Sequence, residues 1–90
     1  MEIRLYDHKR KKFQIDDIIK FINRADEEIL YAKITKLHIF KNFEELYNNF
    51  DKTYLGYKEN EIANPNDMNK YYSLEDQNKY GVVGIEIELI

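Results

Sequence analysis

ILYAKITKLHIFKNFEELYNNF, residues 29–50, joins a long extended stretch to a helix and so decides the fold class of this chain. The apolar residues of its first half fall into two parities along the strand: Leu30, Ala32 and Ile34, then Leu37 and Ile39. The phase slips near Thr35 and Lys36. We therefore expect a bulge or sharp bend there, which returns both apolar sets to one interior, as at the corners of small barrels.

The second half of this segment predicts a helix that packs on a sheet. Asn42 can accept a hydrogen bond from a backbone N–H two or three residues on, and Glu45 completes a capping box. The apolar residues follow at i, i+3, i+4 and i+7: Phe43, Leu46, Tyr47 and Phe50. A single apolar stripe must be buried against another element, so strand and helix together predict an α+β fold.

Further strands are predicted on both sides of this segment. Residues 2–6 and 82–90 alternate apolar and polar side chains, and residues 18–22 are rich in β-branched and aromatic types. A polar connection over residues 51–61 leads to Asn64-Pro65, which can begin a second short helical region. The 90 residues suit one core, so we predict a single domain over residues 1–90.

Composition excludes several classes of protein. The chain has no cysteine, which rules out disulfide frameworks and thiolate zinc sites and favours a cytoplasmic location. Its longest apolar run, residues 81–90, is interrupted by Glu86 and Glu88 and is far too short for a membrane span, so we expect a soluble protein.

Chemical motifs are equally sparse. His8 and His38 stand thirty residues apart without a ligand pattern, and no nucleophile elbow, glycine-rich phosphate loop or HExxH helix occurs. The sequence therefore predicts no metal site and no cofactor, and it assigns no catalytic residue.

Charge is distributed unevenly along the chain. The net charge of −3 argues against binding nucleic acid through charge alone. Residues 1–40, however, hold nine Lys and Arg against seven Asp and Glu, whereas residues 41–90 hold five against ten. The densest cluster consists of four consecutive cations: Lys9, Arg10, Lys11 and Lys12. These residues either neutralise phosphates or form a solvated loop.

Arg4 stands in the first strand between Ile3 and Leu5. Its guanidinium either points into the mouth of a barrel, where it can bind an anion through two hydrogen bonds, or pairs with a strand glutamate. Glu2 is a further candidate contact in such a cleft.

Six of the eight tyrosines fall into two groups. Four stand where the helices and the last strand should pack: Tyr47, Tyr71, Tyr72 and Tyr80. Tyr54 and Tyr57 lie in the polar connection instead, and are the better candidates for ligand contact by stacking.

Four segments in this order resemble the bacterial ASCH family: Glu2-Ile3-Arg4-Leu5, LHIFKNFEEL at residues 37–46, Tyr71-Tyr72-Ser73, and YGVVGIEI at residues 80–87. The resemblance reaches across nearly the whole chain. It implies a small PUA-like open β-barrel with two short helices and a cleft that accepts RNA or a modified nucleoside. An arginine also stands in the family at the position matching Arg4.

The chain departs from the family at its beginning. Family members usually start with another strand and helix, ending in a Gly-x-Lys stretch just before the segment that matches residues 2–5. Some small members are amidohydrolases on acylated cytidine that use this lysine, so its absence here argues against an enzyme. We expect RNA or nucleotide binding through Arg4 and residues 9–12. The alternatives are an amidohydrolase and a protein-binding regulator, and the uncovered first strand favours a homodimer or protein partner.

Overall fold

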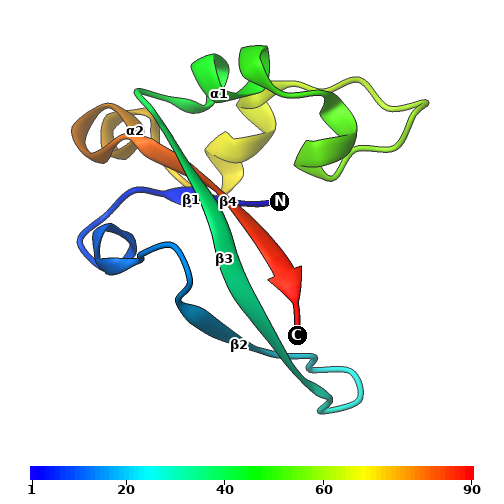
Figure 1. Ribbon diagram of the computed structural model, residues 1–90. Coiled ribbons are helices and arrows are strands. Elements are labelled where there is room, and N and C mark those ends of the chain that lie inside the picture. The colour runs from blue at the N-terminus through cyan, green and yellow to red at the C-terminus, as the bar shows by residue number, and fades with distance from the viewer.

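The computed structural model describes all 90 residues and centres on one antiparallel sheet of four strands (Figure 1). The strand order is β1 (Glu2–Leu5), β4 (Val82–Leu89), β3 (Ile29–Phe40) and β2 (Ile18–Ile22). Every pairing is antiparallel, and β1 and β2 form the two edges. The sheet curls into an open half-barrel, so the predicted α+β fold, a small open β-barrel with two short helices, is confirmed.

Two α-helices and three short 3-10 helices complete the fold: α1 (Phe43–Asn49), α2 (Leu74–Tyr80), η1 (Arg10–Lys12), η2 (Lys52–Leu55) and η3 (Pro65–Lys70). The predicted cap of α1 is present, since Asn42 Oδ1 accepts from the Glu45 N–H at 2.9 Å. Ser73 Oγ caps α2 in the same way at 3.1 Å. The polar connection contains η2, which the sequence did not predict, because 3-10 turns need no apolar stripe.

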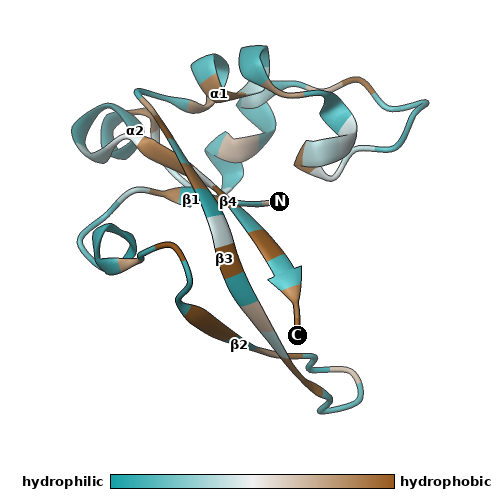
Figure 2. Ribbon diagram, viewed as in Figure 1, coloured by the Kyte–Doolittle hydropathy of each residue, from teal (hydrophilic) through white to brown (hydrophobic).

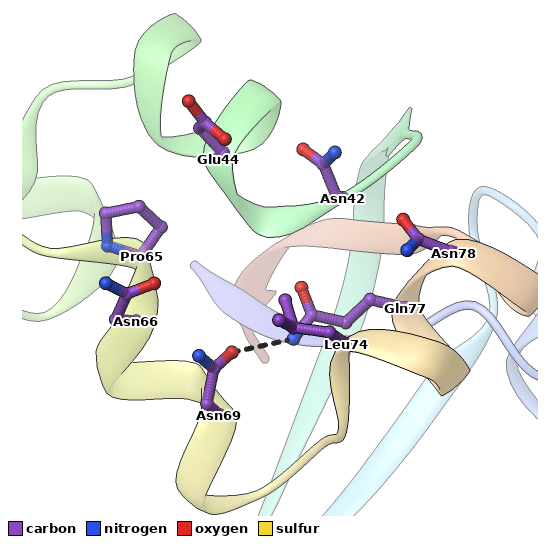
Figure 3. Close-up of a pocket in the computed structure, with 8 residues that line it drawn as sticks. All are labelled: Asn42, Glu44, Pro65, Asn66, Asn69, Leu74, Gln77 and Asn78. Atoms are coloured by element: carbon purple, nitrogen blue, oxygen red, sulfur yellow. Dashed lines mark hydrogen bonds between the residues drawn. The ribbon is translucent and has the colours of Figure 1, made fainter.

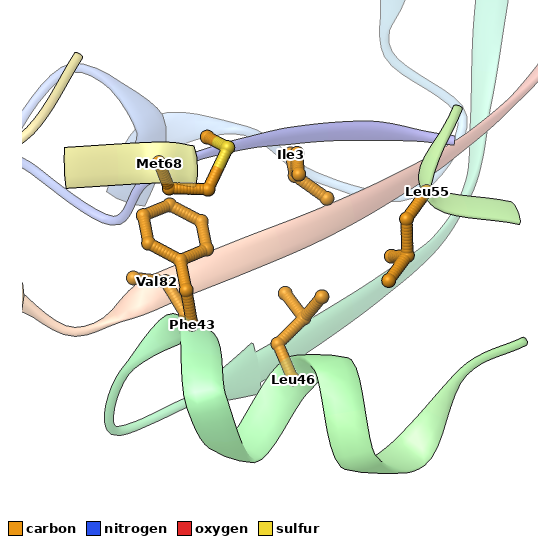
Figure 4. Packing of buried hydrophobic residues seen from close by; sticks show 6 residues of the cluster. All are labelled: Ile3, Phe43, Leu46, Leu55, Met68 and Val82. Carbon is orange, nitrogen blue, oxygen red and sulfur yellow. The ribbon is translucent and has the colours of Figure 1, made fainter. Parts of the chain in front are cut away.

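The larger core cluster lies between the sheet and the helices (Figure 4). It consists of residues from β1, β4, α1, η2 and η3: Ile3, Val82, Phe43, Leu46, Leu55 and Met68. Phe43 and Leu46 are fully buried, as the apolar stripe predicted. One of the four tyrosine predictions was wrong: Tyr71 is 71% exposed, because it follows the last turn of η3 and its side chain faces solvent.

The other face of the sheet has its own buried cluster of Ile34, Val83 and Ile85. The predicted irregularity in β3 is present as a register shift between Ile34 and Lys36. As a result, Leu37 packs against the same cluster as Ile34. The expectation that the bend returns both apolar sets to one interior fails for Ile39. This residue is 54% exposed because nothing covers that part of the sheet.

The segment between β1 and β2 covers this second cluster. It lies across the side of the half-barrel that the sheet leaves open (Figure 1). Phe13 and Ile19 pack against the cluster. Two backbone hydrogen bonds attach the segment to β3: Asp16 N–H to Ile34 O at 2.8 Å, and Ile34 N–H to Asp17 O at 2.9 Å. The basic segment before Phe13 is thereby held beside β1.

Apolar side chains are exposed at the end of the sheet farthest from the helices, and Figure 2 shows β2 as strongly hydrophobic. They come from β2, β3 and the end of the chain: Ile18, Ile22, Ile29, Tyr31, Leu89 and Ile90. None of the helices has the length and apolar character needed to cross a bilayer.

Candidate nucleic-acid interface

A hollow of about 110 Å³ lies between β1, the η1 segment and β2. Its charged residues are four of those singled out by the sequence: Glu2, Arg4, Lys9 and Arg10. Its apolar residues are Phe13, Ile19, Phe21 and Ile85. The curl of the sheet therefore brings residues from both edge strands to one place, with cations beside two aromatic rings.

Arg4 is held in a fixed position within this hollow. Its Nη2 lies 2.7 Å from Glu2 Oε2, and its Nη1 donates to the Ile3 carbonyl at 2.8 Å. The side chain of Arg4 remains 41% exposed. The guanidinium thus pairs with a strand glutamate, which is one of the two interpretations from the sequence, and it still has N–H donors available at the hollow.

Arg10 is fixed in a similar way by Asp7. The Asp7 carboxylate accepts from the backbone N–H of Arg10 at 3.1 Å and from its Nη1 at 2.9 Å. Partial burial raises the pKa of Asp7, but the hydrogen bonds and positive charge of Arg10 outweigh this, so the pKa lies below its usual value. Asp7 stays ionised at neutral pH and holds η1 in place.

The three lysines of the segment are held less firmly than the arginines. Lys11 Nζ lies 5.7 Å from the centre of the Tyr6 ring, a weak cation–π contact. Lys9 and Lys12 are exposed and form no ion pair. Residues 1–12 carry five cations against two carboxylates, so this surface is positive although the whole chain is acidic.

Tyr57 and Tyr54 do not reach this hollow. Tyr57 lines a separate cavity of about 300 Å³, where its hydroxyl donates to Asp67 Oδ2 at 2.7 Å and lies 3.1 Å from the Tyr47 hydroxyl. Burial, together with these hydrogen bonds, raises the pKa of Tyr57 well above its usual value. Tyr57 therefore ties η3 to α1. Tyr54 is 57% exposed and lines none of the cavities.

The two histidines contact different residues. The ring of His8 meets Tyr80 edge-on, with 6.0 Å between ring centres. His38 Nε2 lies 2.6 Å from Glu86 Oε2 on the neighbouring strand, and this hydrogen bond lowers the pKa of Glu86.

The sequence did not single out Phe13 and Phe21 as site residues. Phe13 follows the basic run directly, and Phe21 lies in β2 with a parity opposite to that of Ile18 and Ile22. The position of Phe13 beside the basic run could have identified it, because an aromatic residue next to several cations is the combination used to bind nucleic-acid strands.

The chain is similar to solved structures over almost its whole length. The crystal structure of hypothetical protein PH0355 has 29% sequence identity and a TM-score of 0.70, covering 98% of this chain and 79% of that one. The solution structure of protein PF0455 from Pyrococcus furiosus has 28% identity and a TM-score of 0.68, covering 99% and 78%. No family model and no curated protein matches the sequence. These likenesses support the fold.

Proposed function

We propose that this protein binds single-stranded RNA or a nucleotide through the hollow between β1, η1 and β2. The observation that carries the proposal is the meeting of Arg4, Lys9 and Arg10 with Phe13 and Phe21 around one concave surface. Cations bind phosphates without regard to sequence, and aromatic faces stack with any base. The resemblance to ASCH domains points to the same class of ligand.

The size of the hollow favours binding over catalysis. Its volume of about 110 Å³ is well below the roughly 300 Å³ or more typical of pockets that enclose small-molecule ligands. A phosphate or the edge of a base fits there, while the rest of a strand lies across the surface. This geometry favours an RNA-binding module over the alternative of a nucleoside amidohydrolase, which must surround its substrate to exclude water.

The carboxylates beside the cations define how the hollow binds an anion. Glu2 and Asp7 orient the guanidinium groups of Arg4 and Arg10 and occupy some of their donors. A fixed guanidinium loses less side-chain entropy when a phosphate binds. The nearby carboxylates also repel phosphate, so Lys9 and Lys12 supply the uncompensated positive charge. We expect moderate affinity with a clear dependence on salt.

The salt dependence of RNA binding tests this proposal. In the double variant Lys9→Gln/Lys12→Gln, the slope of log K against log salt should fall by about 1.4, since each phosphate contact to a single strand contributes about 0.7. Neither lysine has an ion pair, so the fold should be unaffected. Fluorescence anisotropy with a short labelled single-stranded RNA at several salt concentrations measures the slope.

The matched control is Lys41→Gln/Lys58→Gln, which changes the net charge equally at two exposed lysines outside the hollow. This variant should keep the wild-type slope. Equal slopes for the two double variants, or no RNA binding by the wild type, would remove the η1 segment from the interface.

We also propose that a second copy of this chain covers the apolar end of the sheet. The outer edge of β2 has unpaired backbone groups, and Ile18, Ile22 and Ile29 beside it are about half exposed. Free strand edges flanked by apolar side chains pair readily with another strand. An antiparallel pair of β2 strands would join two sheets and cover both edges.

Light scattering at increasing concentration should therefore give a mass approaching twice the 11.0 kDa of one chain. Ile22→Lys should shift the protein towards the monomer, because the charge would be buried at the contact. Ile62→Lys is the control, since Ile62 is 89% exposed and lies outside this end of the sheet. A wild-type protein that stays monomeric at all concentrations would contradict the dimer.

A further inference from the structure

We propose that a further cavity, bounded by α1, η3 and α2, binds a single unpaired nucleobase that carries an amino group. The cavity has a volume of about 270 Å³ and lies on the helical side of the sheet (Figure 3). None of its lining residues belongs to the hollow between β1, η1 and β2. The site is therefore separate from the proposed phosphate-binding surface.

Gln77 is the central observation, because this polar side chain is only 3% exposed. Its Nε2 donates to the Tyr72 carbonyl and to Asn69 Oδ1, each at 3.1 Å. A carbonyl only accepts, so the bond to Tyr72 fixes which end of the amide is nitrogen. The oxygen must then be the other end, and Figure 3 shows it directed into the space between α1 and η3.

Gln77 Oε1 has no hydrogen-bond partner within the protein. No fully inaccessible side-chain atom lacks a partner, so this oxygen must be reached through the cavity. Water that enters the cavity can donate to this oxygen, and a ligand that supplies a donor takes the place of that water. Gln77 thus provides an acceptor that is already oriented for a ligand.

Two further amides are oriented by bonds within the protein. Asn42 Oδ1 accepts from the Glu45 N–H, and Asn69 Oδ1 accepts from Gln77 Nε2. Each bond fixes the oxygen and leaves the Nδ2 group as a donor without an internal partner. The cavity therefore has donors of known identity as well as the Gln77 acceptor.

The charges around the cavity exclude an anionic ligand. Glu44 is the one ionisable residue of the lining, and it makes no ion pair. No lysine, arginine or histidine is present to bind a phosphate or carboxylate. A carboxylate instead accepts from N–H groups, and repels anions. The part of the ligand that meets the cavity is therefore not an anion, and a group with two N–H donors suits the two acceptors, Glu44 and Gln77.

An amino-bearing nucleobase meets these requirements. Adenine, cytosine and guanine each have an exocyclic amine next to a ring or carbonyl acceptor, and Asn, Gln and Glu are the side chains that read such edges. Uracil has a single N–H donor and cannot serve both acceptors. Pro65 and Leu74 supply apolar surface for the flat ring. Unpaired RNA bases are recognised in this way when they turn out of the strand.

Uncharged nucleosides test this site independently of the proposed function. Adenosine, cytidine, guanosine and uridine carry no phosphate, so the cations of the hollow do not bind them, and Gln77 and Asn69 line only the cavity between the helices. Nuclear magnetic resonance titration of the full chain would follow the side-chain amide signals of Gln77 and Asn69. We expect these signals to shift with at least one amino-bearing nucleoside, and at least about fivefold weaker binding of uridine, which has one donor fewer.

The variant Glu44→Ala/Asn78→Ala removes two exposed lining groups that have no internal hydrogen bond. It should weaken nucleoside binding by at least about tenfold, as expected for the loss of hydrogen bonds to a base edge. Glu59→Ala/Asn60→Ala is the matched control, because it removes one acid and one amide from exposed positions outside the lining. The control should bind as the wild type does.

Three results would overturn the inference. The first is the absence of any shift with all four nucleosides. The second is equal shifts with ribose alone, which would identify a sugar site. The third is equal affinity of the two double variants. None of these results depends on the salt slope of RNA binding, so the two proposals fail separately.

Discussion

Phe43→Ala should lower the free energy of unfolding by about 3 to 5 kcal/mol, the usual cost of removing a fully buried phenylalanine from a core. The ring is 0% exposed and belongs to the larger core cluster. It stacks on Tyr72, with 5.9 Å between ring centres. Because Phe43 contacts elements from both ends of the chain, no neighbour can move in to fill the space without breaking another contact.

The expected loss from Phe43→Ala is large relative to the total free energy of unfolding. A 90-residue domain is expected to have a stability of about 5 to 13 kcal/mol, so this variant should be close to unfolded at 37 °C if the wild type is at the lower end. Urea denaturation followed by circular dichroism measures the change. Tyr54→Ala is the control, since Tyr54 is 57% exposed and should change stability by less than about 0.5 kcal/mol. Similar midpoints for both variants would show that α1 does not anchor the core.

The sequence predicted those features that depend on local periodicity. The apolar stripe of α1 follows from side-chain spacing, and its cap follows from the reach of one amide oxygen at Asn42. The irregularity of β3 was visible as a change of parity beside Thr35. Each of these features is fixed by a short local stretch of chain, so a single sequence contains enough information.

Features that depend on which surfaces meet were not predictable in the same way. Phe13 and Phe21 form one hollow only because the sheet curls and brings its two edges together. Gln77 is buried because η3 and α1 pack beside α2, and a glutamine in a short polar helix gives no such signal. Tyr71 was expected in the core because it stands in the second helical region with Tyr72, but at the end of η3 only Tyr72 packs on the core and Tyr71 is exposed.

Gly81→Ala should lower the free energy of unfolding by about 2 to 3 kcal/mol, because Gly81 has a backbone conformation that is essentially restricted to glycine. Its φ is 76° and its ψ is −176°. A Cβ at this position would lie 3.0 Å from the backbone oxygen of Phe40, which belongs to β3 and cannot turn aside as a side chain can. The residue joins α2 to β4, so the strain falls on both elements.

The hydrogen bonds of Gly81 extend this effect to the proposed base site. Its N–H donates to the Gln77 carbonyl at 2.8 Å, and its carbonyl accepts from the Tyr6 N–H at 2.9 Å. A shift at Gly81 therefore moves the end of α2 that carries Gln77, and nucleoside binding should weaken along with stability.

Gly56→Ala is the comparison for Gly81→Ala, because it carries a cost of backbone conformation without a steric contact. Gly56 has a φ of 91° and a ψ of 6°, in the left-handed region, but a Cβ added to it would have no other atom within 4 Å. Its replacement should cost only about 1 kcal/mol, the penalty of the left-handed conformation. Urea denaturation of both variants gives the difference, which reports the contact with Phe40 together with the greater backbone strain at Gly81. Equal losses would mean that the junction between α2 and β4 yields to a methyl group, and that the position of Gln77 does not depend on glycine at residue 81.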